Sequence, residues 1–159
     1  MDDKWMVRYA MLWPIGLSPV APGTCASLAA IIAAPFIFMP LDFSWRLIML
    51  CAIYYTGVRC CDRAEKALGE KDPKSVVIDE LFGQWLVLLP FYGLMYWELA
   101  AAFVLFRIFD IYKPWPVSAA EKIPGGTGIM VDDLVAALYA MICMAGVRWV
   151  GMYNGWNIL

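Results

Sequence analysis

Acidic side chains stand at the ends of several apolar segments of this chain, where they could share one metal ion. They are Asp79, Glu80, Asp110, Asp132 and Asp133. A carboxylate deep in a bilayer costs about 2.5–3.5 kcal/mol, so five unpaired ones would cost on the order of 15 kcal/mol. Arg107 and Lys113 can neutralise two of them. The remaining negative charge predicts a bound cation, and a donor set made only of oxygen favours Mg²⁺ over Zn²⁺.

Each of these acids also has a simpler interpretation as a helix cap. An acidic side chain near a helix N-terminus is stabilised by the positive end of the helix dipole. Asp132 fits this role because it follows a glycine-rich turn. For any single acid, a cap and a metal ligand are equally favoured. Two adjacent acidic pairs together with Asp110 favour a shared ion, since capping alone would require several independent coincidences.

A second set of residues could bind an anion such as a phosphate. Arg107 would act as a bidentate donor and Lys113 as a point charge. Thr24 and Ser27 would add hydroxyl groups, and the glycine-rich turn at 125–128, which includes Gly126, would add backbone N–H groups. Simpler roles stay open for each group. These are a local ion pair of Arg107 with Asp110, binding of helix-end carbonyls by Lys113, an N-cap at Thr24 and a plain turn at the glycines.

Several kinds of chemistry are excluded by what the sequence lacks. It has no histidine, so no imidazole can act as base, nucleophile or metal ligand. None of its five cysteines has an arginine six residues later, which excludes a cysteine-phosphatase loop, and no Asp-x-Asp motif occurs. Phosphomonoester hydrolysis is among the slowest uncatalysed reactions, requiring up to ~10²¹-fold acceleration. Metal-activated water is therefore the natural remaining mechanism for it.

The elements that must position these groups are helices. Of 159 residues, 63% are hydrophobic and 16% are charged, and the mean hydropathy is +0.67. This composition predicts one all-α, membrane-associated domain over 1–159, and the net charge of −2 argues against nucleic-acid binding. Apolar runs and prolines predict five or six helices and no strand. The main ones cover about 24–35, 45–58, 77–89, 96–110 and 130–149, with a polar loop at 59–74.

The apolar runs are short for complete membrane spans. Only 17 uncharged residues separate Glu80 from Glu98, whereas a full span takes about 20. The basic segment 59–74 is expected to face the cytoplasm. Alternate crossings then place four polar clusters on that same side, and together they would form a site. The clusters are the turn at 22–24, the pair 79–80, the segment 107–113 and the segment 125–133.

Four segments of the chain resemble motifs of the phosphatidylglycerophosphatase A family of bacterial membrane enzymes. The resemblance covers about residues 18–140 and rests on APGTCASL at 21–28, VIDELFGQW at 77–85, FRIFDIYKPWP at 106–116 and GGTGIMVDD at 125–133. It implies a small all-α bundle of about six helices in the bacterial inner membrane, with its active site facing the cytoplasm. It also implies Mg²⁺-dependent removal of the terminal phosphate from the phospholipid phosphatidylglycerophosphate, giving phosphatidylglycerol.

Under this interpretation the acids and the anion-binding groups have separate roles. Asp79, Glu80, Asp132 and Asp133 would hold Mg²⁺, one of them acting instead as general base, and Asp110 would be a further ligand or would orient Lys113. Thr24, Ser27, Arg107, Lys113 and Gly126 would bind the phosphate. Two alternatives stay open. One is a phosphatase for another lipid or isoprenoid phosphate, and the other is an intramembrane ion or proton carrier, whose acids would lie at different depths.

Overall fold

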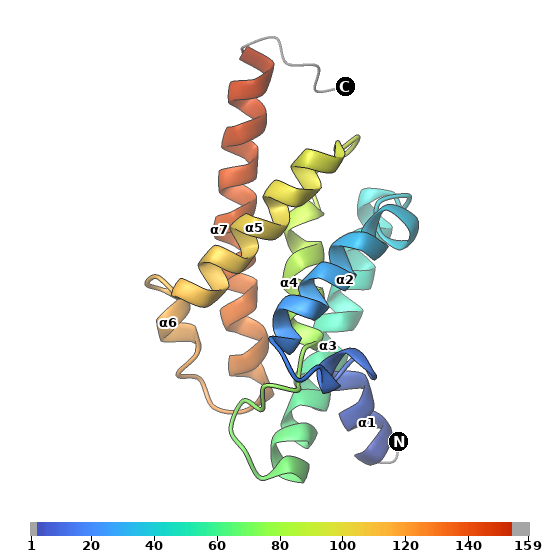
Figure 1. The fold of residues 1–159 in the computed structure, drawn as a ribbon, viewed down its shortest axis with the longest axis vertical. Helices are drawn as coiled ribbons and strands as arrows, with labels where there is room; N and C mark the ends of the chain where they lie inside the picture. Colours follow the sequence, from blue (N-terminus) through green and yellow to red (C-terminus); the bar gives the residue numbers. More distant parts are fainter. Residues whose placement is uncertain (1–2, 154–159) are drawn as a thin grey trace.

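The computed structural model describes residues 3–153, which fold into one all-helical bundle (Figure 1). The predicted all-α fold is therefore confirmed, and no strand occurs in this range. The described residues form seven α-helices and one short 3₁₀ segment, η1. In chain order they are α1 (Asp3–Ala10), η1 (Ile15–Leu17), α2 (Pro22–Ile37), α3 (Phe43–Leu68), α4 (Ile78–Leu88), α5 (Tyr96–Tyr112), α6 (Val117–Ala120) and α7 (Gly126–Tyr153).

Helix α4 lies at the centre of the bundle and carries the first acidic pair. It packs against α2, α3, α5 and α7, and Figure 1 shows α5 crossing in front of it. Its residues are apolar and buried on most sides, as expected for a core helix. Gly83 lets α5 approach closely, since a Cβ there would overlap the ring of Phe106. Asp79 and Glu80, in the first turn of α4, are therefore held among neighbouring helices.

Helix α3 is much longer than the sequence pattern predicts. The expected loop at 59–74 is wrong in its first half, because the helix continues to Leu68 and ends at Gly69, whose φ is +70°. Cys60, Cys61 and Ala64 continue the buried face of α3 through this polar stretch. Of the charged residues between them, Arg63 is exposed, whereas Asp62 is half-buried and contacts the start of α7.

Other helix ends differ from the expectations by a few residues. Helix α1 was not predicted, and α2 continues past Pro35 to Ile37. Helix α7 begins at Gly126, before the predicted start near 130, and extends beyond 149 to Tyr153. Its first N–H group, on Gly126, donates to Oδ1 of Asp62 at 2.6 Å. A side chain distant in sequence thus caps α7.

Arg46 joins three helices at the end of the bundle away from the acids. Its side chain is 1% exposed. The guanidinium donates to the carbonyl oxygens of Met39 at 2.6 Å, Leu41 at 2.9 Å and Phe91 at 2.7 Å, and it lies 4.1 Å from the centre of the Tyr92 ring. Arg46 therefore satisfies the carbonyl groups that follow α2 and α4, where a helix has no partners of its own.

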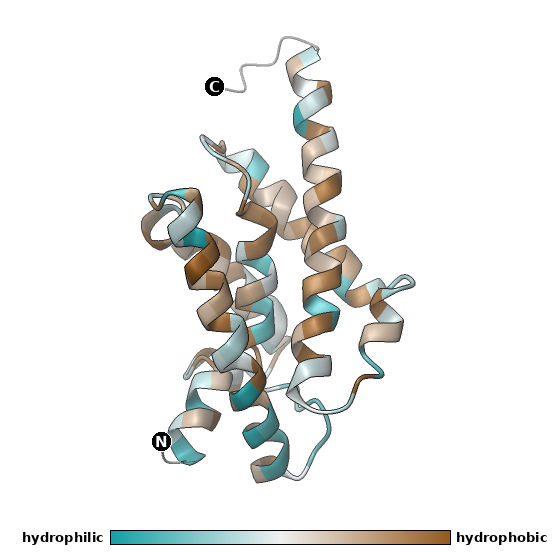
Figure 2. Cartoon of the chain, turned by 180° about the vertical axis from the view of Figure 1, so that it is seen from behind, coloured by the Kyte–Doolittle hydropathy of each residue, from teal (hydrophilic) through white to brown (hydrophobic). Residues whose placement is uncertain are grey.

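The outer surface of the bundle is strongly apolar. Among the described residues, α7 is the one helix that is long and apolar enough to cross a membrane. Large apolar side chains are also exposed on other helices, including Ile32 and Phe36 on α2 and Trp45 on α3. Figure 2 shows hydrophilic residues gathered at the end where α3 finishes. An exposed apolar surface of this extent is typical of a protein that contacts lipid or another protein.

Candidate active site

A polar cavity of about 320 Å³ lies where the predicted clusters meet. Its walls come from the start of α2, the loop before α4, the first turn of α4, the end of α5 and the second turn of α7. The residues from these elements include Thr24, Asp79, Glu80, Arg107, Asp110, Lys113, Asp132 and Asp133. The structure thus brings together side chains that are more than a hundred positions apart in sequence, as the sequence analysis expects.

Three of the five acids form a compact group. Asp79, Glu80 and Asp133 each offer one carboxylate oxygen, and these oxygens lie within 4.8 Å of one another. Each of the three residues also has a buried oxygen without a hydrogen-bond partner. Buried carboxylate oxygens without donors are costly unless a cation compensates them. Their chemistry therefore fits a hard divalent ion such as Mg²⁺.

The pKa values of the grouped acids also favour a bound cation. Burial raises the pKa of Glu80 to about 8, and the charge of Asp133 contributes to this shift. Burial, and then the charge of Glu80, raise the pKa of Asp79 well above its usual range. The site therefore resists carrying several negative charges by itself. A bound divalent cation would favour the ionised carboxylates, which are the forms that bind metal.

The other two acids lie closest to the two basic residues. Asp110 Oδ2 lies 2.5 Å from Arg107 Nη1, and Asp132 Oδ2 accepts a hydrogen bond from Lys113 Nζ at 2.7 Å. Neither joins the group of three acids, although both line the same cavity. The expected surplus of negative charge is thus located at Asp79, Glu80 and Asp133.

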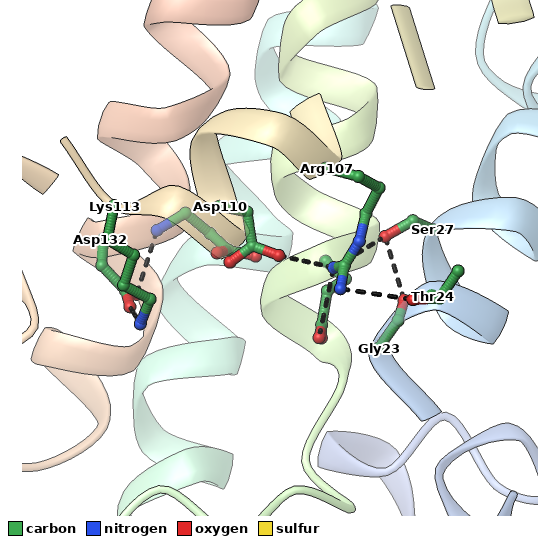
Figure 3. A network of polar contacts seen from close by, with 9 residues as sticks. Gly23, Thr24, Ser27, Arg107, Asp110, Lys113 and Asp132 are labelled. Atoms are coloured by element: carbon green, nitrogen blue, oxygen red, sulfur yellow. Dashed lines mark hydrogen bonds and ion pairs between the residues drawn. The ribbon is translucent and has the colours of Figure 1, made fainter. Parts of the chain in front are cut away.

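Arg107 connects α5 to the start of α2 (Figure 3). Its two terminal nitrogens lie 3.4 Å from the hydroxyl oxygens of Ser27 and Thr24, and Nη1 lies 3.9 Å from Glu80 Oε1. Ser27 in turn donates to the carbonyl oxygen of Gly23 at 3.0 Å. The Arg107 Nε group is buried and has no partner. Arg107, Ser27 and Thr24 thus converge beside the acids, as predicted for an anion-binding group.

Lys113 reaches the site from the end of α5. Its φ of +43° is left-handed, a conformation that costs an L-residue about 1–2 kcal/mol. The ammonium group contacts Asp132 and also Glu121 Oε1 at 3.1 Å. Burial opposes the charged form, but the two carboxylates outweigh it, so the pKa of Lys113 is raised above its ordinary value. Lys113 therefore keeps its positive charge at the cavity wall.

Three predicted roles differ from what the structure shows. Gly126 does not line the cavity, and its N–H group is already bound to Asp62, so this geometry does not bring it to the phosphate-binding group. Thr24 is not the N-cap of α2; Ala21 holds that position with a φ of +43°. The Asp132 side chain accepts from Lys113 and from the N–H of Asp133 within α7, and does not cap its start.

Sequence reasoning missed several groups at the cavity. The backbone of Gly23 closely approaches Glu80, because a Cβ at this position would overlap Glu80 Oε1. The N–H groups of Gly23 and Thr24 belong to the first turn of α2 and have no partner inside the helix. Asp72 and Lys74 also line the cavity. Their position just before the acidic pair is the sequence signal that indicates them.

The sequence of this chain is similar to known proteins of one family. The profile of the phosphatidylglycerophosphatase A family matches residues 9–148. An *Escherichia coli* K12 protein named phosphatidylglycerophosphatase A is 38% identical over 94% of this chain and 87% of its own length. A *Haemophilus influenzae* protein of the same name is 37% identical over 84% of this chain and 83% of its own.

A third relative has a different name. This *Bacteroides thetaiotaomicron* protein, provisionally named a phosphatidylinositol-3-phosphatase, is 41% identical over 85% of this chain and 88% of its own length. No solved structure matches the chain significantly. The profile match covers most of the sequence and includes every residue of the three-acid group. The chain therefore belongs to the phosphatidylglycerophosphatase A family.

Proposed function

We propose that this protein is a Mg²⁺-dependent lipid phosphatase that hydrolyses the terminal phosphomonoester of phosphatidylglycerophosphate. The observation that carries the proposal is the group formed by Asp79, Glu80 and Asp133, which each bring one carboxylate oxygen within 4.8 Å of the others and each have a buried oxygen without a partner. This group shares a cavity with Arg107 and Lys113. A site for a hard cation next to basic side chains suits a phosphate ester, and two relatives carry the name of this activity.

In this proposal the three grouped acids hold the ion. When bound, Mg²⁺ supplies Lewis acidity that polarises phosphate oxygens and lowers the pKa of bound water. Arg107 binds the phosphate oxygens in a bidentate manner, and the hydroxyl group of Thr24 together with the first N–H groups of α2 adds donors. The buried Ser27 hydroxyl already donates to Gly23 and accepts from Arg107, so it positions Arg107. Lys113 contributes positive charge and fixes Asp132. One carboxylate among Asp79, Glu80, Asp132 and Asp133 accepts the proton of the attacking water.

The proposal places the site at the cytoplasmic face of the bacterial inner membrane. Asp132 and Asp133 lie in the second turn of α7, close to the start of this helix, which among the described residues is the one of spanning length and apolarity. Hydrophilic residues gather toward this end of the bundle (Figure 2). A phospholipid keeps its head group at the surface while its acyl chains stay in the bilayer, so a site at this depth reaches the scissile bond.

A second candidate is a phosphatase for another lipid phosphate, favoured by the name of the *Bacteroides* relative. The ion-carrier alternative is disfavoured because the acids are gathered at one cavity and are not spread along a path. Phosphate release by the purified protein in detergent separates the two phosphatase candidates. The substrates are phosphatidylglycerophosphate, phosphatidylinositol 3-phosphate, phosphatidate and undecaprenyl phosphate, each with Mg²⁺ or with EDTA.

We expect the first substrate to be hydrolysed at least about ten-fold faster than the others, which corresponds to about 1.4 kcal/mol of discrimination. EDTA is expected to stop the reaction. Faster phosphate release from phosphatidylinositol 3-phosphate would support the second candidate, a phosphatase for another lipid phosphate. Activity that is unchanged in EDTA would contradict the metal-dependent proposal.

Mg²⁺ should also stabilise the folded protein independently of catalysis. A ligand that binds only the native state at 100 times its Kd contributes about 2.7 kcal/mol, which raises the Tm by roughly 5–10 °C for a domain of this size. Thermal unfolding is measured in detergent with MgCl₂ and with NaCl of equal ionic strength. An equal shift in NaCl, or in the Asp79→Asn variant, would show that the three acids do not hold the ion.

A further inference from the structure

We propose that an apolar groove between α2 and α5 binds one acyl chain of the lipid whose phosphate lies in the polar cavity. This inference rests on the proposed lipid substrate but names a separate binding element. The groove has a volume of about 230 Å³. From α5 it is lined by Phe103, Val104, Ile108, Ile111 and Tyr112.

The groove adjoins the polar cavity. Thr24, Arg107 and Ile111 line both spaces. The polar ends of Thr24 and Arg107 point toward each other in the network of Figure 3. A molecule that fills both spaces therefore has an anionic head and an apolar tail joined at this boundary, which is the chemistry of a phospholipid.

The composition of the groove suits a hydrocarbon chain. Arg107 is its one charged lining residue among the residues described, and this guanidinium is engaged by Asp110 and the α2 hydroxyls. The outward residues Val104 and Ile108 are 50% and 42% exposed. An acyl chain can thus enter from the side of α5 without leaving apolar surroundings.

A larger apolar hollow on the other side of α2 does not have this relation to the site. It has a volume of about 700 Å³, and Trp5, Trp13 and Trp85 are among its lining residues. None of the residues described as lining it also lines the polar cavity. By volume this hollow would be the better site for an acyl chain. A lipid whose phosphate lies at Arg107, however, reaches the smaller groove directly.

The groove is expected to orient the substrate more than to increase its affinity. A chain that moves from the bilayer into the groove exchanges one apolar environment for another, so little hydrophobic free energy is gained. Fixing the chain at Ile111 sets the direction from which the head group enters the cavity. Misplacement of a reacting group by about 1 Å can reduce a rate about 100-fold.

The test fills the groove and compares two substrates with the same head group. Ile108→Trp places a large ring in the groove. The substrates are dioleoyl phosphatidylglycerophosphate and its deacylated counterpart, which has no acyl chains. We expect the ratio of their kcat/KM values, long-chain over deacylated, to fall at least about ten-fold in this variant. Ile142→Trp on α7 is the matched control, because Ile142 is 66% exposed and lines neither space. An unchanged ratio in Ile108→Trp would overturn the proposal.

A second measurement does not depend on catalysis or on a folded variant. Wild-type protein in EDTA is cross-linked to phosphatidylglycerophosphate that carries a photoreactive diazirine in one acyl chain. Labelling concentrated in peptides that contain 103–112 supports the groove, whereas equal labelling around Ile142 contradicts it. If wild-type protein releases no phosphate from this lipid but labelling is concentrated at 103–112, the proposed function fails and the groove stands. If the protein releases phosphate from this lipid but labelling is not concentrated at 103–112, the groove is rejected and the proposed function stands.

Discussion

Replacing Asp133 by asparagine is expected to reduce phosphate release from phosphatidylglycerophosphate at least about 1,000-fold. Loss of a group at the reacting centre commonly has effects of this size or larger. The substitution keeps the shape of the side chain but removes one of three carboxylates whose oxygens lie within 4.8 Å of one another. A hard divalent ion then loses an anionic ligand, so the stabilisation by Mg²⁺ should disappear as well.

The same variant should fold normally, which separates lost chemistry from lost structure. Asp133 is 3% exposed and lies beside two other acids, so removing its charge also removes repulsion when no cation is added. We therefore expect the Tm without Mg²⁺ to be no lower than that of the wild type. Asp3→Asn is the control, since Asp3 is an exposed acid on α1. More than a tenth of the wild-type activity in Asp133→Asn would contradict the assignment.

Arg46→Met is expected to cause the largest loss of stability, about 3–5 kcal/mol. Each buried carbonyl left without a donor costs about 1–3 kcal/mol, and Arg46 serves the carbonyls of Met39, Leu41 and Phe91. Methionine preserves most of the volume and removes every donor. The free energy of unfolding is measured by thermal or denaturant unfolding in detergent.

Arg59→Met is the matched control for this stability effect. Arg59 lies on the same helix but is exposed, with its guanidinium over the Tyr55 ring at 4.4 Å. We expect a change of less than about 1 kcal/mol, as for other surface sites. Equal losses in the two variants would mean that the buried carbonyl contacts of Arg46 contribute no special stability.

The helical architecture is predictable because it depends on local patterns. Prolines and apolar runs indicate the middle of α2, α4, α5 and α7 correctly. The extension of α3 to Leu68 is not visible in this way, because burial of Cys60 and Cys61 depends on helices that are distant in sequence. The start of α7 likewise depends on Asp62, which is 64 residues from Gly126. Such tertiary contacts override local composition.

The meeting of the polar clusters is also predictable, but their pairing is not. Alternating crossings place the acids and bases on one side of the bundle. Which base neutralises which acid depends on side-chain directions at the end of α5, where Arg107 turns toward α2 and Lys113 toward α7 (Figure 3). The sequence therefore indicates that negative charge exceeds positive charge at the site. The structure shows that this excess is concentrated at Asp79, Glu80 and Asp133.

The division of the grouped acids between two helices has a consequence for biosynthesis. Asp79 and Glu80 belong to α4, whereas Asp133 belongs to α7, which follows much later in the chain. A nascent chain still missing α7 has neither the third carboxylate nor the wall that carries Asp132. In the proposed function, the metal site therefore forms only once translation has passed Asp133.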